Sequence, residues 1–112
     1  MKILITVADS EIAPRFDLTT EVVIGVSDGG ALRDEPRTLL LPGSNAQALC
    51  DLIVRERIDA LICGAIEENY YHFLTWKKIK VFDFIIGAHT EALRLLVEGG
   101  LEPGTVLSSA RD

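Results

Sequence analysis

The chain has 112 residues and a formal net charge of -6, which argues against nucleic acid or an anionic membrane as its main partner. Its length fits one domain, and its two cysteines are too few for a disulfide framework. The apolar stretch at the amino terminus is too short for a membrane span or a signal peptide, so we expect a cytoplasmic protein.

The first 41 residues are typical of three strands separated by turns. Residues 3–7 are apolar and β-branched, which predicts a short buried strand, and a proline among acidic residues predicts a loop over residues 8–14. Residues 20–27 predict a second strand, and the Asp-Gly-Gly turn after it predicts a hairpin into a third strand over residues 31–41. Pro36 places that third strand at an edge or on a bulge.

The clearest predicted element is a helix that follows a Pro-Gly pair. Ser44 and Gln47 have the spacing of a capping box, which predicts that Ser44 caps the helix. Apolar side chains recur at helical spacing along one face, at Ala46, Leu49, Cys50, Ile53 and Val54. We therefore expect Cys50 to be a small buried hydrophobic side chain.

Alternating strands and helices occupy most of the remaining chain. In chain order we expect a strand over residues 59–63, a helix over 67–78, a strand over 79–84 and a helix over 89–98. The middle helix has glutamates at its start and lysines at its end, as the helix dipole prefers. One domain is expected over residues 1–103, with a carboxyl-terminal tail over residues 104–112.

The order of these elements predicts an α/β fold with a mixed five-stranded sheet flanked by helices. Right-handed crossovers place the fourth strand beside the first, which gives the strand order 3-2-1-4-5 with strand 2 antiparallel. The carboxyl ends of the first and fourth strands then meet where the chain connections leave in opposite directions, so a crevice is expected there. Asp9 and the Cys63-Gly64 pair would flank this crevice, and residues 8–17 would form its rim.

Motifs for several chemistries are absent from the sequence. It contains neither a glycine-rich phosphate loop nor a nucleophile elbow, and neither His72 nor His89 has a partner at zinc-site spacing. Without a nucleophile–base pair or an acid/base dyad, an enzyme is the least favoured class of function.

Three side chains near the expected crevice have both a functional and a structural interpretation. Cys63 could supply a thiolate to a soft metal or cluster, or it could be a buried packing residue. Arg15 could bind an anionic ligand or be solvated at the surface. Phe16 could line a pocket or pack in the core.

Five segments occur in a characteristic order and spacing: Met1-Lys2-Ile3-Leu4-Ile5 before Asp9, Arg15-Phe16-Asp17, Leu61-Ile62-Cys63-Gly64-Ala65-Ile66, Leu74 before Ile79-Lys80-Val81-Phe82, and Gly87 before Thr90-Glu91-Ala92-Leu93. Together, over about residues 1–103, they resemble the dinitrogenase iron–molybdenum cofactor biosynthesis family. It implies a ribonuclease H-like fold. It also implies binding rather than catalysis, because better-known members hold iron–molybdenum cofactor or an iron–sulfur precursor and pass it on.

The resemblance implies a site as well as a function. The chain would be a small non-catalytic carrier that meets a cluster-assembly protein, with Cys63 as a metal ligand and a cofactor-binding set of Asp9, Arg15, Phe16, Cys63 and Gly64. Two departures bear on this expectation: Arg15 stands where the family has a histidine, and Asp17 where it has a glycine. Arginine is a poor metal ligand.

An alternative is a family member that has lost the cluster and acts as a protein-interaction or regulatory module. Glu67 and Glu68, after the fourth strand, would repel an anionic cluster and favour this alternative. The second and third strands also leave an open sheet edge, so the chain could be a monomer or a homodimer.

Overall fold

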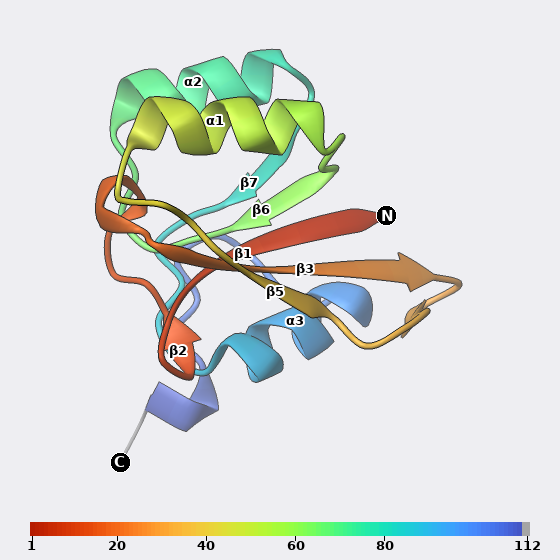
Figure 1. Ribbon diagram of the computed structural model, residues 1–112. Helices are drawn as coiled ribbons and strands as arrows, with labels where there is room; N and C mark the ends of the chain where they lie inside the picture. Colours follow the sequence, from red (N-terminus) through yellow and green to blue (C-terminus); the bar gives the residue numbers. More distant parts are fainter. Residues whose placement is uncertain (111–112) are drawn as a thin grey trace.

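The structure, a computed structural model, describes residues 1–110 and has one mixed sheet with helices against both faces (Figure 1). Its strands are β1 (Lys2–Ala8), β2 (Glu11–Ile12), β3 (Glu21–Asp28), β4 (Ala31–Leu32), β5 (Arg37–Leu40), β6 (Ala60–Ile62) and β7 (Lys80–Phe82). Its helices are α1 (Ala46–Arg55), α2 (Glu68–Trp76) and α3 (His89–Val97), with short 3-10 turns η1 (Phe16–Leu18) and η2 (Ser108–Ala110). The predicted α/β class is confirmed. Within residues 1–110, none of the helices is long and apolar enough to cross a membrane.

Strand β1 is the centre of the sheet because it is paired on both sides. It runs antiparallel to β3, with Leu4 opposite Ile24, and parallel to β6, with Leu4 opposite Leu61. The strand order is β4-β3-β1-β6-β7, with β5 also paired to β3 and β2 to β1. Because β1, β6 and β7 are parallel, their carboxyl ends lie at one edge of the sheet, where α/β proteins commonly bind ligands.

Side chains of β1 alternate between two hydrophobic cores. Leu4 packs with residues of α1 and α2, including Ile53 and Leu74, whereas Ile3 and Ile5 pack with residues of α3. All of these side chains are buried. Figure 1 shows α1 and α2 over one face of the sheet and α3 against the other. A strand covered on both faces explains the continuous apolar run in this part of the sequence.

The sheet differs from prediction in its number of strands. The third strand, expected over residues 31–41, is divided into β4 and β5, which both pair with β3. Pro36 lies between them and has no N–H for the ladder, and regular pairing resumes at Arg37. The loop expected over residues 8–14 contains β2, which forms a hairpin with β1. The described residues therefore form seven strands rather than five.

Helix α1 is capped one residue later than predicted. Asn45 is the capping residue, because its side-chain oxygen accepts a hydrogen bond from the N–H of Ala48 at 3.0 Å. Gln47 donates to Asp51 at 3.2 Å instead of returning to the cap. The capping box predicted from Ser44 and Gln47 is wrong, because asparagine caps as well as serine does and lies next to the first helical residue.

The segment expected as a tail is ordered over residues 104–110. Leu107 is 1% exposed and packs in the core on the α3 side, and its N–H donates to Ile86 at 2.8 Å. The carboxylate of Glu91 on α3 accepts hydrogen bonds from the Ser108 hydroxyl at 2.5 Å and from the Ser109 N–H at 2.9 Å. These contacts attach the segment to α3, while residues 111–112 of the expected tail lie outside the described part of the chain.

We expect Asn45→Ala to lower the free energy of unfolding by about 1 kcal/mol, because the N–H of Ala48 loses its partner. Ser44→Ala is the matched control, and it should change stability by less than about 0.5 kcal/mol. Urea unfolding of both variants measures the difference. A larger loss in Ser44→Ala would show that the serine caps the helix in solution.

A second prediction concerns the stability of the fold at low pH, which depends on Glu91. Hydrogen bonds from Ser108 and Ser109 lower the pKa of Glu91 from 4.5 to about 2. A carboxyl group whose folded pKa is depressed stabilises the fold above its unfolded pKa, and this stabilisation is lost as the pH falls through the folded pKa. The wild type should therefore be more stable than Glu91→Gln at pH 6, with a difference that shrinks between about pH 4.5 and pH 2. A pH-independent difference in urea unfolding would contradict this expectation.

Candidate functional site

The loop after β1 lies directly on the loop after β6. The N–H of Phe16 donates to the carbonyl of Ala65 at 2.8 Å, and the N–H of Ala65 donates to the carbonyl of Pro14 at 2.8 Å. The crevice that we expected between Asp9 and Gly64 is therefore filled by the chain itself.

Gly64 allows this close approach because it has no side chain. A Cβ atom at this position would collide with the carbonyl oxygens of Ala13 and Pro14, the latter at 2.5 Å. Glycine is the residue that permits two backbone segments to pack so closely. Gly64 thus shapes the rim through its backbone.

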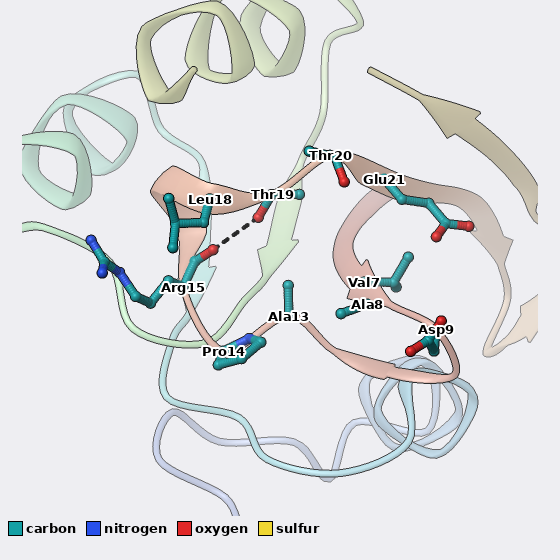
Figure 2. A pocket seen from close by; sticks show the side chains of 10 residues that line it. All are labelled: Val7, Ala8, Asp9, Ala13, Pro14, Arg15, Leu18, Thr19, Thr20 and Glu21. Carbon is teal, nitrogen blue, oxygen red and sulfur yellow. Dashed lines mark hydrogen bonds between the residues drawn. The ribbon is translucent and has the colours of Figure 1, made fainter. Parts of the chain in front are cut away.

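A cavity lies on the other side of β1, between the end of β1 and the beginning of β3 (Figure 2). It has a volume of about 360 Å³ and is lined by Val7, Ala8, Asp9, Ala13, Pro14, Arg15, Leu18, Thr19, Thr20 and Glu21. Antiparallel pairing places Glu21 opposite Val7, so the first residue of β3 borders the end of β1. Of the expected site residues, Asp9 and Arg15 line this cavity, whereas Phe16, Cys63 and Gly64 are not among its lining residues.

The charged groups of the cavity are separated in space. Figure 2 shows the carboxylates of Asp9 and Glu21 on one side and the guanidinium of Arg15 directed away from both. Arg15 instead binds Asp17, with Nε 3.1 Å from Oδ1 and Nη2 2.6 Å from Oδ2. This two-point hydrogen bond raises the pKa of Arg15 and lowers the pKa of Asp17. The cavity therefore has an acidic side, and its arginine is engaged at the surface.

The turn that carries Asp9 is held by the beginning of α3. Asp9 has a φ of 57°, a left-handed conformation that aspartate adopts more readily than most residues. The backbone N–H of His89 donates to the carbonyl of Ser10 at 3.1 Å, and its ring Nδ1 lies 2.8 Å from the same oxygen. Since that oxygen can only accept, Nδ1 carries the proton. His89 therefore has a structural contact that fixes one wall of the rim.

Phe16 and Cys63 lie in the core rather than at the surface. Phe16 is 1% exposed, and its ring centroid lies 6.1 Å from that of Tyr70. Cys63 is completely buried in the core between the sheet and α1 and α2, not at the crevice mouth where it was expected. Burial, with a smaller effect of the Asp83 carboxylate, raises the pKa of the Cys63 thiol well above its ordinary value. The thiol is therefore protonated and enclosed, which disfavours metal ligation.

The described residues do not fit a metallocluster at this rim. Within residues 1–110, no three histidine, cysteine, aspartate or glutamate side chains are placed to hold a metal ion. One histidine–carboxylate pair exists on the exposed face of α2, where Nε2 of His72 lies 3.2 Å from Glu68. An anionic iron–sulfur or iron–molybdenum cluster would meet no accessible thiolate here and would face the carboxylates of Asp9 and Glu21.

The far wall of the cavity, formed by residues 18–21, was not predicted from the sequence. The turn η1 leaves the side chain of Leu18 57% exposed, and the Thr19 hydroxyl donates to the carbonyl of Arg15 at 3.1 Å, the dashed line in Figure 2. One signal in the sequence could have indicated this wall. An antiparallel second strand must begin where the first strand ends, which places Glu21 at the rim.

No family model matches the sequence, and no curated protein matches it. Solved structures share its fold. PH0822 has a TM-score of 0.82 and 14% identity, covering 92% of this chain and 94% of that chain. Methanocaldococcus jannaschii MJ0327, described as a "putative dinitrogenase", has a TM-score of 0.72 and 24% identity, covering 97% and 96%. Thermotoga TM1290, described as a "putative NifB protein", has a TM-score of 0.69 and 20% identity, covering 95% and 96%. At these identities the likeness establishes the fold alone.

We expect Gly64→Ala to lower the free energy of unfolding by more than about 2 kcal/mol, because the new methyl group meets backbone atoms that cannot move independently. Gly43→Ala is the matched control, since a Cβ there has no neighbour within 4 Å. The control should change stability by less than about 1 kcal/mol. Equal effects of the two substitutions in urea unfolding would show that the rim is not closed in solution.

Proposed function

We propose that this chain is a small non-catalytic binding protein, related to the dinitrogenase iron–molybdenum cofactor biosynthesis family, and that the rim is its working surface. Two family-like segments, Arg15-Phe16-Asp17 and Cys63-Gly64, are far apart in sequence and lie together through the hydrogen bonds at Ala65. MJ0327, described as a "putative dinitrogenase", and TM1290, described as a "putative NifB protein", have the same fold over nearly their whole length. In this proposal the fold is ribonuclease H-like and the protein is cytoplasmic.

Binding suits this rim better than catalysis because three of its polar side chains are engaged in structural contacts. Arg15 is paired with Asp17, the hydroxyl of Thr19 donates to the backbone, and His89 holds the carbonyl of Ser10. A nucleophile or general base needs a group that is free to transfer a proton or to attack a substrate. The contacts at the rim favour rigidity over such reactivity.

Within this proposal, the rim serves a protein partner rather than holding a cluster. The observation that carries this choice is the complete burial of Cys63 in the core between the sheet and the helices α1 and α2. The cavity also presents the carboxylates of Asp9 and Glu21, which disfavour an anionic cargo. Next to the cavity, the side chains of Arg15 and Leu18 are 59% and 57% exposed, and they offer a partner one basic and one apolar contact. The partner would be a cluster-assembly protein, and the module would regulate or recruit it.

Anaerobic incubation with ferrous iron and sulfide, followed by desalting, tests this choice against a carrier function. The wild type should remain colourless with an iron content near zero, because the rim supplies no accessible thiolate. Arg15→His introduces at the rim the imidazole that the family has there, and Arg15→Ala is its control. A higher iron content in Arg15→His than in Arg15→Ala would show that the wild type lacks this imidazole for cluster binding. Stoichiometric iron and broad visible absorbance in the wild type, weakened by Arg15→Ala or Cys63→Ala, would establish a carrier instead.

Partner binding is measured with the purified chain in the presence of a chelator. Leu18→Glu should abolish the capture of cluster-assembly proteins, because it places a charge in the apolar contact at the rim. Leu32→Glu is the matched control, since Leu32 is 39% exposed but lies on β4, beside the opposite end of β3. Loss of capture in the control, or retention in Leu18→Glu, would place the interaction elsewhere.

A further inference from the structure

Strand β5 is an edge of the sheet, and its outer side is open. Among the described residues it pairs with β3 alone. The N–H of Leu41, just after the strand, donates to the carbonyl of Thr20. In an antiparallel strand, the backbone N–H and C=O groups of every second residue point to the same neighbouring strand. The backbone groups of Leu39 therefore also point to β3. The backbone N–H and C=O groups of Thr38 and Leu40 therefore point away from the sheet.

Between the two prolines that bound it, this edge exposes an apolar side chain. Leu40 is 79% exposed and has the highest exposure among the large hydrophobic side chains of the described residues. The guanidinium of Arg37, at the start of the strand, is paired with Glu56, the residue after α1, at 3.0 Å. Prolines at positions 36 and 42 bound the edge, which leaves residues 37–41 free to pair. An exposed apolar edge of this kind is a template for another strand.

We propose that β5 pairs with β5 of a second copy and forms an antiparallel homodimer with a continuous sheet. The two-fold axis passes between the two Leu39 residues. In this register Thr38 of each copy lies opposite Leu40 of the other, and each such pair exchanges both of its outward N–H···O bonds. A shift by one residue would set outward groups against inward ones, and a shift by two would set Pro36 or Pro42, which has no N–H, opposite an outward residue, so the register centred on Leu39 fits the edge best.

Self-association fits this edge better than pairing with an unrelated segment, for two reasons. The outward groups are arranged symmetrically about Leu39, so the edge is complementary to itself. A mainly apolar groove of about 560 Å³, lined by Leu41, Pro42 and Leu52 among others, lies between α1 and the segment that joins β5 to it. Figure 1 shows α1 and β5 on the same side of the molecule, connected by this segment. In the joined sheet the α1 sides of both copies share one face, which adds apolar area to a short strand pair.

Disulfide trapping tests the register directly. In the proposed dimer the two Leu39 residues form a non-hydrogen-bonded pair with Cα atoms about 4.5 Å apart, a separation that a disulfide can span. Leu39→Cys should therefore give a covalent dimer on mild oxidation, and the native Cys50 and Cys63 should not compete because both are buried. Arg37→Cys is the matched control on the same face, and its two copies would be too far apart to link. Equal linking of the two variants, or no linking of Leu39→Cys, would overturn the proposal.

The second measurement avoids any change to the packed side chain of Leu39. Light scattering after gel filtration should give the mass of a dimer for the wild type and for Thr38→Ala. Thr38→Pro removes one outward N–H at an edge position that tolerates proline, so it should give a folded monomer by circular dichroism. A wild type that is monomeric at the highest soluble concentration would overturn the proposal, even if the β5 edge binds another protein. A dimeric Thr38→Pro would also overturn it.

Discussion

The close approach of two backbone segments at Gly64 determines the arrangement of the rim. Ala65 is hydrogen-bonded to both Pro14 and Phe16, so the loop after β1 is fixed on the end of β6. Cys63 precedes Gly64 in the chain and is buried between the sheet and the helices α1 and α2, and Phe16 is buried in the same core. Arg15, between the two bonded residues, points outward. The loop fixed by this backbone contact thus carries one expected site residue that is buried, Phe16, and one that is exposed, Arg15.

Closure of the rim changes what this edge of the sheet can do. In open α/β sheets a ligand commonly lies in the crevice at the carboxyl ends of the strands, and here the chain occupies that space. What remains is a cavity beside β3 with the carboxylates of Asp9 and Glu21, and an outer surface with Arg15 and Leu18. An anionic cluster would meet repulsion and no thiolate. A protein surface could contact both the arginine and the leucine, which is why partner binding suits this geometry.

Features set by local sequence were predictable, whereas those set by contacts between distant segments were not. The apolar face of α1 followed from helical spacing, and Leu49, Cys50 and Ile53 are buried on it. The cap was misassigned because Ser44 and Asn45 both offer a side-chain oxygen, and local sequence does not distinguish them. Cys63 is buried in a core that includes residues distant in sequence, such as Leu4 and Phe16, and strand order alone could not reveal this. Glu21 is placed at the rim by its register with Val7, whereas the sequence predicted only that the two strands pair antiparallel.

The two edges of the sheet differ in a way that bears on assembly. The edge formed by β7 is three residues long and begins with the exposed Lys80, a charged residue of the kind that discourages strand pairing. The edge formed by β5 exposes Leu40, and its arginine is bound elsewhere.

Leu40 lies opposite Glu21, so the β5 edge and the cavity adjoin at the same end of β3. A two-fold axis perpendicular to the sheet would turn the rims of the two copies in opposite directions. Dimerisation through β5 would therefore leave both rims accessible, and one dimer could engage two partner molecules through surfaces that do not compete.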